Sequence, residues 1–222
     1  MWAEMVNLRR IRRILLRLLV AGITLGLLGV LAFAGLIVYY GRNLPDVATL
    51  RDYRPPQTTR VLDRNGALVG EIFLERRTVI PVEQIPRVMV LAVLAAEDAD
   101  FYIHAGLDYR GIARAIMRDI IAGRLEQGGS TITQQVVKVM LLSSERSLSR
   151  KMRELVLARR LEQELTKEEI LHLYLNHVNF GDGHYGVEEA ALYYFGKHAR
   201  DLTLAEATVL AGIPQGPTRL NP

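Results

Sequence analysis

The sequence predicts a mainly α-helical domain preceded by one transmembrane helix and a short β-hairpin linker. Three observations support this fold class: an uncharged run over residues 18–40, an Asn-Gly pair between two β-prone runs, and helical spacing of apolar residues from Pro81 onward. The 222 residues have room for one anchor and one domain of ordinary size. They include no cysteine, which excludes disulfides and thiolate metal sites.

The basic charge is confined to an N-terminal tail, residues 1–17. This tail holds five arginines and one glutamate, a balance of +4 that equals the formal net charge of the whole chain. The remaining 23 basic and 23 acidic residues therefore cancel. The body of the protein lacks the charge that would favour nucleic acid as a partner.

The apolar run Leu18–Tyr40 predicts the membrane-spanning helix, because about 20 such residues cross the hydrocarbon core. Arginines before the run place the N-terminus in the cytoplasm and everything after Tyr40 outside. A cleaved signal peptide is the alternative, since Ala32-Phe33-Ala34 has the small-x-small form of a cleavage site. The apolar run continues six residues past that site, which favours an uncleaved, single-pass anchor.

Residues 41–80 are predicted to form a linker that contains the hairpin. Gly41–Gln57 is polar and carries three prolines, which indicates a segment held off the membrane. Over residues 58–73, two β-prone runs flank Asn65-Gly66, the strongest signal for a two-residue hairpin turn. An isolated hairpin is marginal in water, so we expect this one to pack on something else.

Residues 81–222 are predicted to form the helical domain. Apolar residues recur every three or four positions over residues 112–121, which predicts an amphipathic helix. Capping boxes beginning at Thr166 and at Thr203 predict two further helix starts. Strand signals are nearly absent after Ile80.

Glu97 is the first candidate for chemistry. It lies at the end of an apolar, helix-like run, Val88–Ala96, and a second acid follows it. Apolar surroundings and a nearby like charge both raise the pKa of a carboxylate towards neutrality, where it makes a useful general base. From Glu97-Asp98 alone, a solvated acidic helix end is the better-supported interpretation.

Two further segments could bind an anion. Gly128-Gly129-Ser130-Thr131 precedes an apolar and amide-rich helix whose first turn would offer N–H groups and a hydroxyl, although a capped helix without a ligand is the simpler alternative. Arg146, Arg150 and Glu154 fall four apart on one helix face, with Lys151 adjacent. Several cations around one carboxylate suit a pyrophosphate. The alternative is an exposed ion pair worth ~0.3–0.5 kcal/mol.

The five histidines lack metal-ligand spacing, so we predict no structural metal.

Together these segments resemble the peptidoglycan glycosyltransferases of family 51, the membrane-proximal domain of class A penicillin-binding proteins and of monofunctional transglycosylases. The resemblance covers roughly residues 81–222 and rests on five motifs in order. These motifs are Glu97-Asp98…Phe101…His104…Gly106; Gly129-Ser130-Thr131-Ile132…Gln134-Gln135…Lys138; Arg150-Lys151…Glu154…Ala158…Leu161-Glu162; Tyr174-Leu175-Asn176…Gly181…Tyr185-Gly186…Ala190-Ala191…Tyr194-Phe195-Gly196; and Leu204…Glu206-Ala207…Leu210-Ala211-Gly212…Pro214…Pro217…Asn221-Pro222. Any one motif is weak, whereas five in register are specific.

The resemblance implies a lysozyme-like domain with two lobes around a cleft, which polymerises lipid II. Glu97 would be the general base on the acceptor's 4-hydroxyl, and C1 would invert as undecaprenyl diphosphate leaves. Glu154, the second catalytic glutamate, would position the substrate or a divalent ion. The residues that would stabilise the pyrophosphate charge are Lys138, Arg146, Arg150 and Lys151. The residues that would line the cleft are Ser130, Thr131, Gln134 and Gln135.

The implied partners are lipid II, the growing glycan strand, membrane lipids and other cell-wall synthesis proteins. The implied location is the bacterial inner (cytoplasmic) membrane, with the catalytic domain on the extracytoplasmic side. No cofactor is required, and a divalent cation (Mg²⁺ or Mn²⁺) at the pyrophosphate stays open. The predicted organisation is a cytoplasmic tail over 1–17, the anchor over 18–40, the linker over 41–80 and the glycosyltransferase domain over 81–222.

Several alternatives stay open at this point. The hairpin resembles the linker strands of class A penicillin-binding proteins, so we expect a longer bifunctional enzyme, with a monofunctional one as the alternative. A peptidoglycan-cleaving enzyme on the same fold would use Glu97 as a general acid, but it has no pyrophosphate to hold with Lys138 and Arg150. An inactive membrane-anchored cell-wall scaffold predicts that Glu97→Gln leaves function intact.

Overall fold

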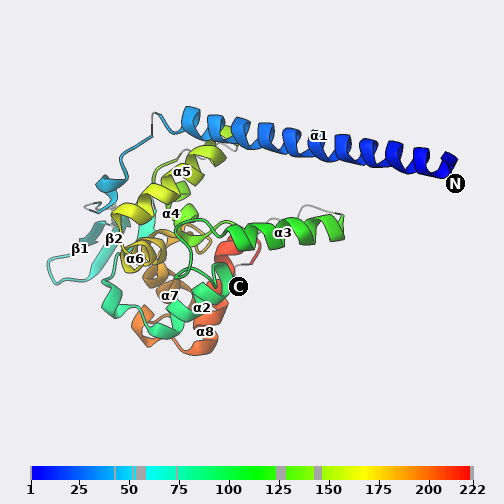
Figure 1. Ribbon diagram of the computed structural model, residues 1–222. Coiled ribbons are helices and arrows are strands. Elements are labelled where there is room, and N and C mark those ends of the chain that lie inside the picture. The colour runs from blue at the N-terminus through cyan, green and yellow to red at the C-terminus, as the bar shows by residue number, and fades with distance from the viewer. Residues whose placement is uncertain are drawn as a thin grey trace. The chain divides into compact units, whose positions relative to one another are not determined.

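The computed structural model describes residues 2–42, 44–51, 53, 59–73, 75–123, 129–142 and 147–220. The chain divides into two compact units, Met1–Leu44 and Pro45–Pro222 (Figure 1). The first unit is built on a single helix. The second holds the remaining helices and the short strands, so the predicted mainly α-helical fold with one hairpin is confirmed.

Helix α1 (Trp2–Tyr40) makes up most of the first unit. Its stretch Arg12–Tyr40 is long and apolar enough to cross a membrane, with a mean hydropathy of 2.4. The apolar side chains between Ile14 and Tyr39 are largely exposed, as a helix that meets lipid on all sides requires. The helix continues through Ala32-Phe33-Ala34, although a signal sequence would meet the same criteria of length and composition.

The second unit begins with segments that the sequence assigned to a linker. The 3-10 helix η1 (Val47–Leu50) is capped by Asp46 and packs on α5 (Leu148–Glu164), where Val47 and Leu50 are buried. Strand β3 (Arg76–Arg77) pairs in parallel with β4 (His184–Tyr185), more than 100 residues further along the chain. The predicted boundary at residue 81 stays a prediction, but parts of 41–80 pack on the helical domain.

The predicted hairpin is present, as β1 (Thr59–Leu62) paired antiparallel with β2 (Leu68–Ile72). The predicted two-residue turn is wrong. A two-residue type I′ turn needs positive φ at both central residues, and here only Gly66 has it, at 84°. Asp63 explains the longer connection, because its carboxylate accepts the N–H groups of Asn65 and Ala67 and its own N–H donates to Ala67 O.

The remaining helices form the body of the second unit. They are η2 (Val82–Gln84), α2 (Arg87–Glu97), α3 (Tyr109–Ala122), α4 (Ile132–Met140), α6 (Lys167–His177), α7 (Val187–Phe195), η3 (Ala199–Asp201), α8 (Leu204–Gly212) and η4 (Ile213–Gln215). The predicted capping boxes at Thr166 and Thr203 are both confirmed, and Thr131 forms a third that was not predicted. Each box fixes the residue at which a helix begins.

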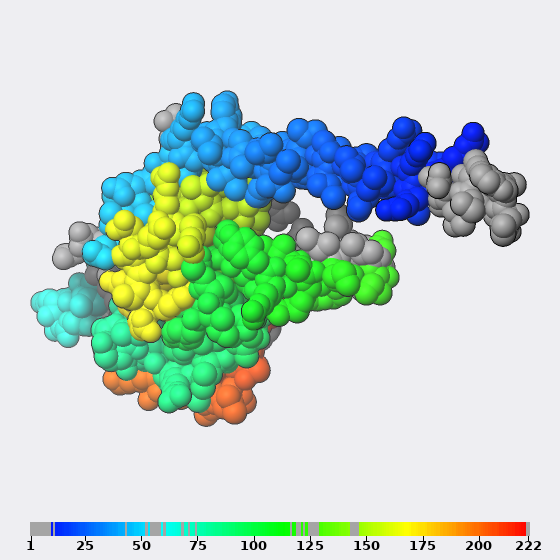
Figure 2. Space-filling model, in the orientation of Figure 1, coloured from blue at the N-terminus to red at the C-terminus, as the bar shows by residue number. Residues whose placement is uncertain are grey.

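Two helix groups build the core. Helix α4 packs on α5 and α6, and α2 packs on α8. The side chains of Ile132, Leu157, Ile170 and Leu210 are fully buried between them. By contrast, α3 extends away from these groups at the edge of the unit, in green in Figures 1 and 2. A cavity lies between the end of α2, the helix α3 and the start of α4.

Candidate active site

Glu97 is placed by the end of α2. The helix begins after Pro86, Met89 and Val93 are buried on its inner face, and α8 packs along it. The residue after Glu97, Asp98, has φ −160° and ψ 75°, so the helix ends there and the chain turns away. Glu97 is therefore the last helical residue, held on a packed element with its side chain at the rim of the core.

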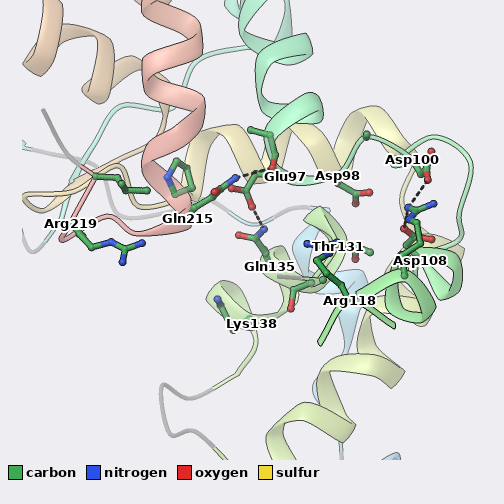
Figure 3. A pocket seen from close by; sticks show the side chains of 18 residues that line it. Glu97, Asp98, Asp100, Asp108, Arg118, Thr131, Gln135, Lys138, Gln215 and Arg219 are labelled. Carbon is green, nitrogen blue, oxygen red and sulfur yellow. Dashed lines mark hydrogen bonds and ion pairs between the residues drawn. The ribbon is translucent and has the colours of Figure 1, made fainter. Parts of the chain in front are cut away.

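The carboxylate of Glu97 is partly buried and makes one short hydrogen bond. Gln135 Nε2 donates to its Oε2 at 2.6 Å, whereas Oε1 has no hydrogen-bond partner among the described residues (Figure 3). Burial raises the pKa of Glu97, and the hydrogen bond from Gln135 and the charge of Lys138 oppose that rise. The direction of this shift agrees with the general-base interpretation of Glu97 and not with the solvated helix end that Glu97-Asp98 alone favoured.

Glu97 opens onto a cavity of about 620 Å³. One wall comes from the end of α2 and the turn after it, a second from α3, and a third from the start of α4. The fourth wall is the segment Pro214–Leu220, which follows α8. Figure 3 shows Glu97, Gln135 and Lys138 on one side of this cavity and Arg118 and Asp108 on another.

Asp98 orders the turn that follows Glu97. Its carboxylate pairs with His104 Nε2 at 2.9 Å and also accepts the N–H of Ile132 at 3.0 Å. Gly106 completes this loop at φ 88°, where a Cβ atom would lie 2.7 Å from Ala158 O. These contacts join the loop to α4 and α5, which fixes the direction in which Glu97 leaves its helix.

At the start of α4 the structure shows the capped helix that was the simpler alternative to an anion site. The N–H of Thr131 donates to Gln134 Oε1, the N–H of Ile132 donates to Asp98, and the N–H of Gln134 donates to Thr131 Oγ1. Three of the N–H groups expected to bind a ligand are therefore already used within the protein. Gln134 is buried in this capping box and does not line this cavity, so the structure gives no support to its predicted place in the cleft.

The other predicted site residues fall into two groups. Those that line the cavity with Glu97 are Ser130, Thr131, Gln135 and Lys138. The side chains of Arg150, Lys151 and Glu154 lie on α5 outside its lining. Lys151 Nζ joins the two groups, since it donates to Ser130 Oγ at 3.1 Å and pairs with buried Glu154. Arg146 lies outside the described residues.

The cavity also contains charged residues that sequence reasoning missed. Arg114 Nη2 lies 3.2 Å from Asp100 and 3.3 Å from Asp108, while Arg118 lies one turn further along α3. Arg219 and Gln215 contribute from the segment after α8. The i,i+4 spacing of Arg114 and Arg118 was a usable signal for one charged helix face. Nothing local in the sequence places Gln215 or Arg219 beside Glu97.

Metal binding finds no support in the described part of the chain, where no three His, Cys, Asp or Glu side chains converge as ligands would. The cavity instead combines one carboxylate of raised pKa, neutral amides, three aspartates and four cations, of which Arg114 is paired with Asp100 and Asp108. That set suits proton removal beside a phosphate-type anion.

Comparison with known proteins identifies the family. The transglycosylase family matches residues 65–222. The chain belongs to the transglycosylase family. It is 42% identical over 205 residues to penicillin-binding protein 1A of Aquifex aeolicus (strain VF5), 45% identical over 192 residues to that of Rickettsia felis, and 42% identical over 206 residues to that of Vibrio cholerae.

These alignments cover most of this chain, 90%, 85% and 93% respectively, but only 28%, 24% and 25% of the three relatives. The predicted transglycosylase family is confirmed, together with the lysozyme-like fold class and the glycosyltransferase enzyme class. The similarity to penicillin-binding proteins concerns only the aligned quarter of those relatives. The apolar helix α1 and the penicillin-binding relatives together support a membrane-anchored protein.

Proposed function

We propose that this domain polymerises lipid II into glycan strands and releases undecaprenyl diphosphate with inversion at C1. The observation that carries the proposal is Glu97: a partly buried carboxylate with a raised pKa, held by an amide beside Lys138, in a cavity of a transglycosylase-family chain. Lipid II is a membrane-borne substrate, which agrees with an anchor helix in the same chain.

The transfer needs one proton removed and one anion released. Glu97 takes the proton from the 4-hydroxyl of the acceptor sugar as that oxygen bonds to C1 of the donor. The bond between C1 and the diphosphate oxygen breaks, and the electron pair leaves with the lipid diphosphate. The carboxylate of Glu97 keeps acceptor capacity for this proton, because Oε2 accepts only the hydrogen bond from Gln135 and Oε1, which is buried, has no partner among the described residues. Attack opposite the leaving group inverts C1.

Lys138 is the cation best placed to stabilise the leaving diphosphate, since it lines the same cavity and lies on the helix that carries Gln135. Arg118 and Arg219 add positive charge to other walls of the cavity. Arg146, Arg150 and Lys151 stay predicted contributors, and Glu154 holds the ammonium of Lys151. A divalent cation at the diphosphate stays open.

We place the protein in the bacterial inner membrane with its N-terminus in the cytoplasm, so that the cavity meets lipid II on the extracytoplasmic side. The arginines before α1 support this orientation. The growing glycan strand and other cell-wall synthesis proteins are the proposed partners.

Polymerisation of labelled lipid II by the full chain in detergent tests the proposal. Wild type is expected to produce glycan strands, and Glu97→Gln is expected to produce none detectable. Glu83→Gln is the matched control, because Glu83 is exposed on η2 and does not line the cavity. Strands from Glu97→Gln would remove Glu97 as the base. Cleavage of finished glycan by wild type, without polymerisation, would establish the lytic rival instead.

A further inference from the structure

Gln215 occupies a fixed position at the end of the α8–η4 segment. Leu210, Ala211 and Ile213 are buried where α8 packs on α2, and Pro214 restricts the backbone of η4 immediately before Gln215. The side chain of Gln215 therefore projects from a rigid, packed segment into the wall of the cavity.

The amide of Gln215 binds the end of the helix that carries Glu97. Its Nε2 donates to Ala96 O at 2.9 Å. Carbonyl groups in the last turn of a helix have no partner further along that helix, so Ala96 O needs a donor from elsewhere. Ala96 directly precedes Glu97, and Figure 3 shows the Gln215 amide beside the Glu97 side chain. A residue distant in sequence thus anchors the backbone at Glu97.

Glu97 is consequently flanked by two neutral amides from different elements, Gln135 on α4 and Gln215 on η4. The charged groups that face it are Lys138 on α4 and Asp98 at the end of α2. The phenol of Tyr174 on α6 is also near, since burial chiefly raises its pKa and the charge of Glu97 adds to that rise. An amide donor stabilises a carboxylate without neutralising it, as a bonded cation would. Two amides can therefore hold a base in place and leave it basic.

We propose that Gln215 is a positioning residue for Glu97: it fixes the end of α2 through Ala96 O and presents its amide to the Glu97 carboxylate. The inference rests on the proposed function, because it names how that general base is held. Gln215 touches neither substrate nor leaving group in this role.

Removal of the Gln215 amide is expected to shift the pKa of Glu97 in one direction. Burial is the main cause of the raised pKa of Glu97, and the nearby amide of Gln215 is the weakest of the effects that lower it. Removing the amide therefore raises the pKa of Glu97 further, so that less carboxylate is ionised at a given acidic pH. The acid limb of the pH–rate profile moves to higher pH.

The test compares wild type with Gln215→Met, which keeps the length of the side chain and removes both donor hydrogens. The pKa of Glu97 is read by ¹³C NMR of labelled glutamate side chains in the full chain in detergent, with Glu97→Gln identifying the signal. We expect a higher pKa in Gln215→Met and a kcat lower by about three- to tenfold at the acidic end, with KM little changed. Gln163→Met, at an exposed position of α5, is the matched control.

A measurement on unaltered Gln215 covers the case in which Gln215→Met fails to fold. The side-chain ¹⁵N–¹H signals of Gln215 in wild type are expected to shift with the titration of Glu97, and that shift is expected to vanish in Glu97→Gln. Signals that ignore the titration, or a Glu97 pKa unchanged in Gln215→Met, would overturn the proposal. If Glu97→Gln still polymerises lipid II while the signals titrate, the proposed base fails and the Gln215 contact stands.

Discussion

Glu97, which is partly buried, and Glu154, which is buried, come from the same set of motifs, yet their surroundings are opposite in kind. Glu97 accepts a hydrogen bond from a neutral amide, and one of its oxygens has no partner among the described residues. The Glu154 side chain is 3% exposed and is paired with the ammonium of Lys151. A carboxylate held by amides keeps its basicity, whereas one paired with a cation chiefly holds that cation in place.

The largest expected difference between the two glutamates is in the loss of polymerisation rate when each is replaced by glutamine. We expect Glu97→Gln to lower the rate of lipid II polymerisation by about 10²–10⁴-fold, the usual contribution of a general base. Glu154→Gln should cost less, about tenfold or ~1.4 kcal/mol, because it only releases Lys151 from its position. Single-turnover rates measured for both variants give the ratio. Equal losses would mean that Glu154 also acts on the reacting atoms.

The next largest expected difference is in the unfolding free energy lost when either Lys151 or Glu154, the two partners of the ion pair, is replaced. Lys151→Met leaves the Glu154 carboxylate buried without its cation, which we expect to cost about 3 kcal/mol of unfolding free energy. Glu154→Gln leaves a lysine whose side chain is 42% exposed and can be hydrated, so about 1 kcal/mol is expected. Denaturant unfolding in detergent measures both. The reverse order would show that Glu154 finds another cation once Lys151 is removed.

The smallest expected effect is a gain in stability when Glu97 loses its charge, whereas both changes to the Lys151–Glu154 pair are expected to lower stability. Because burial raises the pKa of Glu97 in the folded protein, the folded state binds more protons than the unfolded state between the ordinary value of 4.5 and the raised value. Stability therefore falls as pH rises through that window, and the ionised carboxylate is a cost at neutral pH. We expect Glu97→Gln to raise Tm by about 2 °C at pH 7 and to lose this gain below pH 4.5.

Thermal unfolding at pH 7 and at pH 4 checks that sign. Glu83→Gln serves again as the exposed control, for which we expect no shift at either pH. A lower Tm for Glu97→Gln at pH 7 would mean that the Gln135 hydrogen bond outweighs the cost of burial.

Local signals in the sequence predicted much of this fold. The capping boxes at Thr166 and Thr203 and the apolar periodicity fixed helix starts, because these interactions lie within one turn of chain. The prediction of the hairpin turn was wrong for a reason that is also local. The Asp63 carboxylate binds two N–H groups of the turn, an interaction that the Asn-Gly signal does not include.

The site was predicted only in part because its contacts join distant segments. Glu97, Gln135 and Lys138 come from motifs whose chemistry is visible in the residues themselves. Gln134 stands next to Gln135 and has the same chemistry, yet the capping box turns it into the core. Gln215 meets Ala96 across 119 residues, a separation that no local pattern reports. Deciding between neighbouring, chemically equal residues requires the packed structure.

The parallel pair of β3 with β4 also bears on how such domains are exchanged in evolution. A recombination breakpoint at residue 81 would bring in a foreign partner for His184-Tyr185 and would remove Val47 and Leu50 from the surface of α5. Inheritance of a working domain therefore favours breakpoints closer to the anchor, before residue 45. The segment between anchor and helical domain is expected to travel with the domain as part of one inherited unit.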